Sequence, residues 1–134
     1  MPETTTTWMP RSGFEQVGGF VWLPRLLDKA RRARTGDLGE YVSLNRGGMD
    51  GIWLRRLKVS PDSIRAWVAE GLDDGAIAER LGEACGMDRA AREQFSRRFV
   101  GMLGAVFAMI DAEEGRRPFT FGLRLVRAIL NLLP

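Results

Sequence analysis

The side chains best suited to chemistry in this sequence gather in two short segments, 25–32 and 40–41. They are Arg25, Asp28, Lys29, Arg32, Glu40 and Tyr41. The first four recur every three or four residues, so on a helix they lie within about a third of its circumference. A glycine-flanked turn could then fold Glu40 and Tyr41 back against that helix. If this face binds a ligand, its arginines favour a carboxylate or a phosphate, because a guanidinium donates two parallel hydrogen bonds to either group.

Two other interpretations of the same face are open from the sequence. It can be a solvated surface with intrahelical ion pairs from Arg25 to Asp28 and from Asp28 to Arg32, each worth about 0.2–0.5 kcal/mol. It can also be a structural network in which Asp28 connects the helix to another segment. A carboxylate beside arginines suits ion pairing better than general-base catalysis. The sequence therefore favours a structural role over a ligand site.

Missing residue types exclude several classes of enzyme and metal site. The chain has no histidine, which removes Ser-His-Asp and Cys-His catalysis and histidine-ligated metals. The chain has one cysteine, Cys85, so an internal disulfide and a cysteine-ligated cluster are both excluded. It follows Ile77 and Leu81 at helical spacing, so we expect an inert thiol in the core. We expect no cofactor and no metal, and the sequence favours a non-enzymatic protein.

Composition predicts one globular domain. The chain has 134 residues, 45% of them hydrophobic, and a net charge of +3, which is mild for a dedicated nucleic-acid binder. All its basic residues except Lys29 and Lys58 are arginine, a bias typical of GC-rich bacterial genomes. The uncharged apolar run from Phe99 to Ile110 is too short for a bilayer, which needs about 20 residues. The N-terminus lacks a secretory signal, and we expect a cytoplasmic protein.

Hydrophobic periodicity predicts an all-α domain of about six helices. They are expected over 21–34, 49–57, 59–71, 73–85, 88–114 and 120–133. Ser60, Asp73 and Thr120 are the expected N-cap residues of three of them. Short extended pieces near 20–22 and 40–43 form at most a minor pair. We expect a disordered tail over 1–9 and a single helical domain over 10–134, in which 116–134 is a C-terminal apolar helix.

The last predicted helix carries little polar surface. Arg124, Arg127 and Asn131 form a narrow polar strip, and the remaining positions are almost all apolar. Such a helix is buried within its own domain, in a partner subunit or at a membrane surface. A homo-oligomer formed through this helix is therefore one expectation for the protein.

A helix-turn-helix is a further hypothesis. Residues 74–82 resemble the first helix of that motif, and four arginines follow on the next helix, namely Arg89, Arg92, Arg97 and Arg98. However, the connection from Glu83 to Asp88 is long for the usual turn of about 3–4 residues. Nucleic-acid binding is therefore the weakest of the functions considered.

The segment from Pro10 to Tyr41 resembles a known family. It contains Pro10-Arg11-Ser12, Gly18-Gly19, an L-P-R-x-L-D-K-x-R helix over 23–31, and G-x-x-G-E-Y over 36–41. This pattern resembles an uncharacterised bacterial family that is classed as a domain of unknown function. The resemblance implies a small, mainly helical protein with no assigned chemistry.

Three functions follow from these observations. We expect a small non-enzymatic helical interaction module. The first alternative is an enzyme or an anionic small-molecule binding protein that uses the Arg25/Asp28/Lys29/Glu40/Tyr41 face. The second alternative is a DNA-binding protein with a helix-turn-helix.

Overall fold

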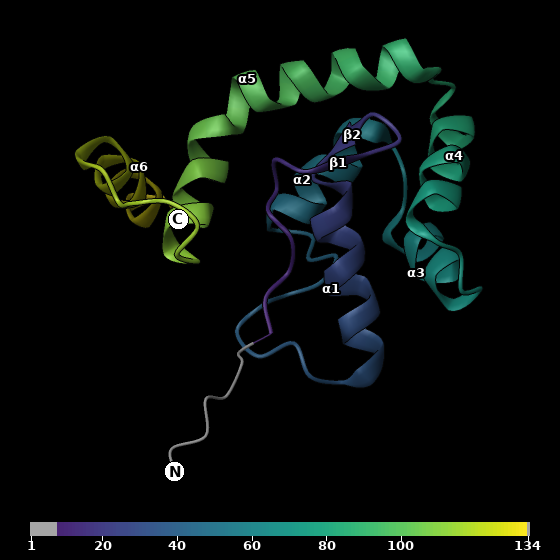
Figure 1. Ribbon diagram of the computed structural model, residues 1–134, viewed down its shortest axis with the longest axis horizontal. Helices are drawn as coiled ribbons and strands as arrows, with labels where there is room; N and C mark the ends of the chain where they lie inside the picture. The colour runs from purple at the N-terminus through teal and green to yellow at the C-terminus, as the bar shows by residue number, and fades with distance from the viewer. Residues whose placement is uncertain (1–7, 134) are drawn as a thin grey trace.

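The computed structural model describes residues 8–133 and is built mainly of helices (Figure 1). The helices are α1 (Leu23–Thr35), α2 (Met49–Leu57), α3 (Pro61–Ala69), α4 (Asp74–Cys85), α5 (Arg89–Glu113) and α6 (Phe121–Leu132). Two short strands, β1 (Gln16–Val17) and β2 (Phe20–Val21), precede α1. The prediction of an all-α domain with six helices and a minor extended pair is confirmed.

Local capping chemistry fixes where four of the helices begin. The side chains of Ser60, Asp73 and Thr120 each accept a hydrogen bond from the backbone N–H three residues later, at 3.3, 2.8 and 3.2 Å. Asp88 does the same for α5, at 2.8 Å. Each bond satisfies one of the N–H groups that the first turn of a helix leaves unpaired. The three N-caps predicted from the sequence are confirmed.

The strand pair differs from the sequence prediction. Strand β2 pairs in antiparallel fashion with β1, with Val17 opposite Phe20, whereas residues 40–43 are irregular. The expectation of an extended segment at 40–43 was wrong. The reason is local: Gly18 and Gly19 have φ values of 58° and 88°, so they form a two-residue turn that joins neighbouring segments at little entropic cost.

Helix α1 is the centre of the fold. Seven of its 13 residues are buried, and it contacts α3, α4 and β1. Helix α5 lies across the hairpin and contacts β2, while α3 and α4 lie along one side of α1 (Figure 1). Leu23, Leu26 and Leu27 are fully buried beside Trp53 and Phe20. The apolar stripe of α1 thus forms the middle of the hydrophobic core.

Helix α6 lies outside this core, against the end of α5 (Figure 1). None of its residues is buried. Burial of the last helix within its own domain, one of the interpretations left open by the sequence, is therefore not observed.

Of the tail expected over 1–9, residues 1–7 lie outside the described part of the chain. Trp8 packs edge-to-face against Tyr41, with 5.6 Å between the ring centroids. Across residues 8–133, no helix combines the length and the apolarity required to cross a membrane.

Candidate functional site

Trp22 begins the site, because it turns the chain from the hairpin into α1. Its φ is 72°, a left-handed conformation that is unfavourable for a bulky residue. Its backbone N–H donates to the carbonyl of Gly13 at 2.9 Å, and its indole Nε1 donates to Asp50 at 2.8 Å. Pro24 then supplies a helical φ in the first turn. These contacts set the position from which the polar side chains of α1 project.

A buried ion pair joins Lys29 of α1 to Asp50 of α2. The Lys29 Nζ lies 2.9 Å from the Asp50 carboxylate, and the two residues are only 6% and 2% exposed. Asp50 also accepts the Trp22 indole N–H and the Leu44 backbone N–H, the latter at 2.8 Å. Burial lowers the pKa of Lys29, although the Asp50 charge opposes that change. The Lys29 ammonium has a counter-ion, and the Asp50 carboxylate accepts three hydrogen bonds, so this pair fits a structural contact.

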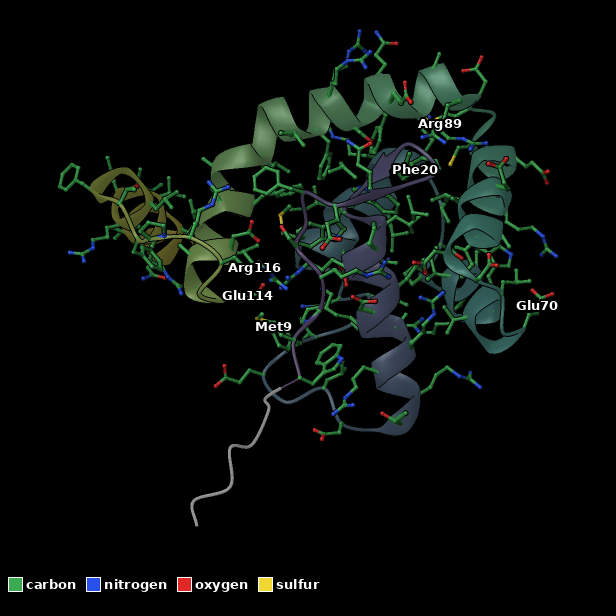
Figure 2. The ribbon with its side chains drawn as sticks, viewed as in Figure 1. Met9, Phe20, Glu70, Arg89, Glu114 and Arg116 are labelled. Atoms are coloured by element: carbon green, nitrogen blue, oxygen red, sulfur yellow. The ribbon has the colours of Figure 1, made fainter. Side chains whose placement is uncertain are left out.

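A second buried pair joins Arg25 to Glu114, just past the end of α5. The Arg25 Nη1 and Nη2 donate to the two Glu114 oxygens at 2.9 and 2.6 Å, and the Tyr41 hydroxyl donates at 3.0 Å. Arg116 also pairs with this carboxylate, and Figure 2 shows Glu114 and Arg116 together near Met9. Burial opposes ionisation of Glu114, but the hydrogen bond and charge of Arg25 outweigh it, so its pKa is lowered. Burial and the bond to Glu114 raise the pKa of Tyr41.

Asp28 connects α1 to the N-terminal segment. It accepts the backbone N–H of Arg11 at 2.8 Å, and the Arg11 guanidinium at 3.0 and 2.8 Å. Arg11 also pairs with Asp74 at 2.9 Å, and Asp74 pairs with Arg31 at 2.6 Å. Burial opposes ionisation of Asp74, but the hydrogen bonds from the two arginines outweigh it and lower its pKa. Of the two structural interpretations left open by the sequence, these contacts fit the network: Asp28 connects α1 to Arg11, and among the described residues it forms no ion pair with Arg25 or Arg32.

A pocket of about 350 Å³ lies beside these pairs. Four of the six predicted site residues line it, namely Arg25, Lys29, Glu40 and Tyr41. Its remaining lining includes Trp22, Met49 and Glu114. Asp28 and Arg32 lie elsewhere: Arg32 donates to the backbone carbonyl of Asp37 at 2.7 Å and stacks over the Trp8 ring. The structure thus gathers part of the predicted face around one pocket.

Each of the two cations at this pocket is neutralised by a carboxylate. Arg25 is paired with Glu114 and Lys29 with Asp50, so neither cation is left for a ligand without a rearrangement. The Arg25 Nε is buried and has no hydrogen-bond partner among the described residues. The same residues contain no group of three or more acidic, cysteine or histidine side chains placed to hold a metal. The geometry is that of an ion-pair network beside a pocket.

Three important members of this network were not predicted from the sequence: Arg11, Asp50 and Glu114. Arg11 is 17 residues from Asp28, and Glu114 is 89 residues from Arg25. No local pattern marks such pairings. Asp50 lies in the first turn of α2, where the helix dipole alone would explain an acidic residue.

The helix-turn-helix region carries a similar contact. Arg92 is only 6% exposed and pairs with Glu79 at 2.9 Å. Its guanidinium also donates to the carbonyls of Met87 and Gly18, at 3.1 and 3.4 Å. The Cys85 thiol, near the end of α4, donates to the Leu57 carbonyl at 3.5 Å, and burial raises its pKa. The side chains of Arg92 and Cys85 thus both face the interior of the protein.

The fold and the site define a small, mainly helical protein whose first helix is anchored by buried ion pairs. The chain belongs to the family described as Domain of unknown function (DUF5069), whose model matches residues 7–104. This match includes α1 to α4 and the first part of α5, and it leaves Glu114 and α6 outside. No curated protein and no solved structure matches the chain.

Proposed function

We propose that the protein is a small non-enzymatic interaction module that forms a homodimer through α6. The observation that carries this proposal is the outer face of α6. Phe121 and Leu132 are 82% and 83% exposed, and Leu125 and Ile129 are each 52% exposed. Large apolar side chains at this density mark an interaction surface more often than a solvated one.

Helix α6 has two apolar faces, and α5 covers one of them. Leu123, Val126 and Leu130 are half-buried on the covered side. Phe121, Leu125, Ile129 and Leu132 recur at helical spacing on the opposite side. An amphipathic helix that only covered α5 would need no such outer face. A second copy of the same helix offers a complementary surface, since a two-fold pairing brings each patch against itself.

The size of this patch sets the expected strength of the dimer. Together with Leu133, the exposed apolar side chains present on the order of 500 Å² to solvent. Two copies would bury about 1,000 Å², which is near the lower limit for a specific interface. We therefore expect a reversible dimer with micromolar affinity.

The non-enzymatic part of the proposal is supported by the α1 face. Its cations are paired internally, which favours a structural role over the anion-binding alternative. A cytoplasmic location belongs to the same proposal, because a single thiol and no disulfide suit a reducing compartment. The arginine-rich composition supports a bacterial source.

Light scattering coupled to size-exclusion chromatography tests the dimer. Across the micromolar range, the mass should rise from 15.0 kDa towards twice that value. Leu125→Glu should keep the protein monomeric, because it places a charge at the centre of the patch. Asn131→Glu adds the same charge on the polar strip and should dimerise normally. A constant monomer mass for the unaltered chain at every concentration would refute the proposal.

A further inference from the structure

We propose that a second pocket, between α2 and α5, binds a small amphiphile that carries a carboxylate. The pocket measures about 340 Å³ and is separate from the one beside Arg25. Its lining includes Arg56 of α2 and Arg98, Phe95, Phe99 and Met102 of α5. The inference is independent of the homodimer, because none of these residues belongs to α6.

The floor of this pocket is apolar and rigid. The rings of Phe95 and Phe99 stack with 5.5 Å between their centroids. Phe99 is 2% exposed and belongs to the hydrophobic core, which holds the stack in place. Met102 is 51% exposed and adds a flexible apolar wall. Such a surface favours a hydrocarbon or an aromatic ring over a polar ligand.

The charge beside this floor is wholly positive. No acidic residue lines the pocket, and across residues 8–133 neither Arg56 nor Arg98 forms an ion pair. The Arg56 Nη2 instead contacts the Met102 sulfur at 3.0 Å, which is a weak acceptor. Two guanidinium groups without a carboxylate partner, one on each helix, provide the donors that a carboxylate needs.

Charge and size together select the occupant. The outer apolar face of α6 borders Arg124, so a second copy of that helix would bring a like charge to Arg56 and Arg98. A carboxylate with an apolar body complements both the charge and the floor. The volume is at the small end for ligand sites, which suits a chain of about eight carbons.

Calorimetric titration of the full chain with sodium octanoate tests this site. Octanoate should bind, whereas octanol and octylamine, which share its chain but lack the carboxylate, should bind at least about tenfold more weakly. The Arg56→Gln, Arg98→Gln double variant should lose binding by about tenfold or more. Both residues are exposed, so the variant should fold normally. Arg97→Gln, which removes a neighbouring exposed arginine outside the pocket, is the matched control and should bind as the unaltered chain does.

A second variant tests the position of the carboxylate. Met102→Glu places an acidic group beside Arg56, so it should pair with that arginine and abolish octanoate binding. The proposal is overturned if the unaltered chain does not bind octanoate, if octanol binds equally well, or if Met102→Glu binds octanoate unchanged. It is also overturned if the double variant binds as tightly as Arg97→Gln.

Discussion

Asp28 accepts hydrogen bonds from both the backbone and the guanidinium of Arg11, and its side chain is 21% exposed. Asp28→Ala leaves the Arg11 N–H without its partner and removes one end of a paired charge. We expect the free energy of unfolding, measured in urea, to fall by about 2 kcal/mol. Asp37→Ala is the control, because that side chain is 76% exposed, and it should change the stability by less than about 0.5 kcal/mol. Equal effects would show that Asp28 is a dispensable surface charge.

Substitutions of Lys29 and Asp50 should have strongly non-additive effects on the free energy of unfolding. Asp50→Ala leaves the Lys29 ammonium buried without a counter-ion, and it also removes the acceptor of the Trp22 indole N–H. We expect a loss of about 3–5 kcal/mol in the free energy of unfolding. Adding Lys29→Met removes the stranded charge, so the double variant should be more stable than Asp50→Ala alone. A double variant that is less stable than Asp50→Ala would contradict this account of the pair.

Glu114 should make stability depend on pH. Its pKa in the folded protein lies below the ordinary value of 4.5, so the unfolded chain binds the proton more readily. Its contribution is therefore present above pH 4.5 and is lost as the pH falls through that value and below it. Glu114→Gln should be less stable than the unaltered chain at neutral pH, and the difference should shrink as the pH falls. Urea unfolding across this range measures the effect, and a difference independent of pH would rule it out.

At the scale of elements, the hairpin depends on one close contact. Gly18 has a φ of 58°, and a Cβ added there would lie 2.4 Å from the Cβ of Ala78. Gly18→Ala should therefore combine backbone strain with a clash and cost more than about 2 kcal/mol. Gly36 after α1 has a φ of 85° but nothing within 4 Å of its added Cβ. Gly36→Ala should cost about 1 kcal/mol, from the strain alone. Similar losses of urea stability for both variants would show that the contact with Ala78 is unimportant.

The elements could be predicted because their signals are local. Ser60, Asp73 and Thr120 cap helices within three residues of themselves, so spacing alone locates them. The same local reasoning missed β1, because a Gly-Gly pair such as Gly18-Gly19 fits an irregular loop as well as a hairpin turn. The sequence also indicated a polar face on α1, and the structure places part of it around a pocket.

The partners of that face could not be predicted. Glu114 reaches Arg25 only because α5 lies across the core and ends beside α1. Arg11 lies in a segment without any hydrophobic period, so nothing in the sequence aligns it with Asp28. Pairings of this kind depend on the packing of whole elements, which propensity and spacing do not determine.

At the scale of the whole molecule, hydrogen bonds join the end of α5 to the N-terminal segment. The Ser12 hydroxyl donates to Asp111 at 2.8 Å, and the Arg116 guanidinium donates to the Pro10 carbonyl. With the pair of Arg25 and Glu114, these contacts join the family-matched part of the chain to residues beyond 104. Helix α6 follows this junction and packs against α5, while its outer face is exposed.

Hydrogen exchange should distinguish the stability of the core helix α1 from that of α6. Amides of α1 are surrounded by the core and should exchange only when the whole domain unfolds. Amides of α6 should exchange much faster in dilute protein, because no residue of this helix is buried. If α6 forms the dimer interface, its protection should rise with protein concentration, while that of α1 stays constant. Leu125→Glu should remove the concentration dependence and leave α1 unaffected. Protection of α6 equal to that of α1 in dilute solution would mean that the helix is stabilised by more than its packing against α5.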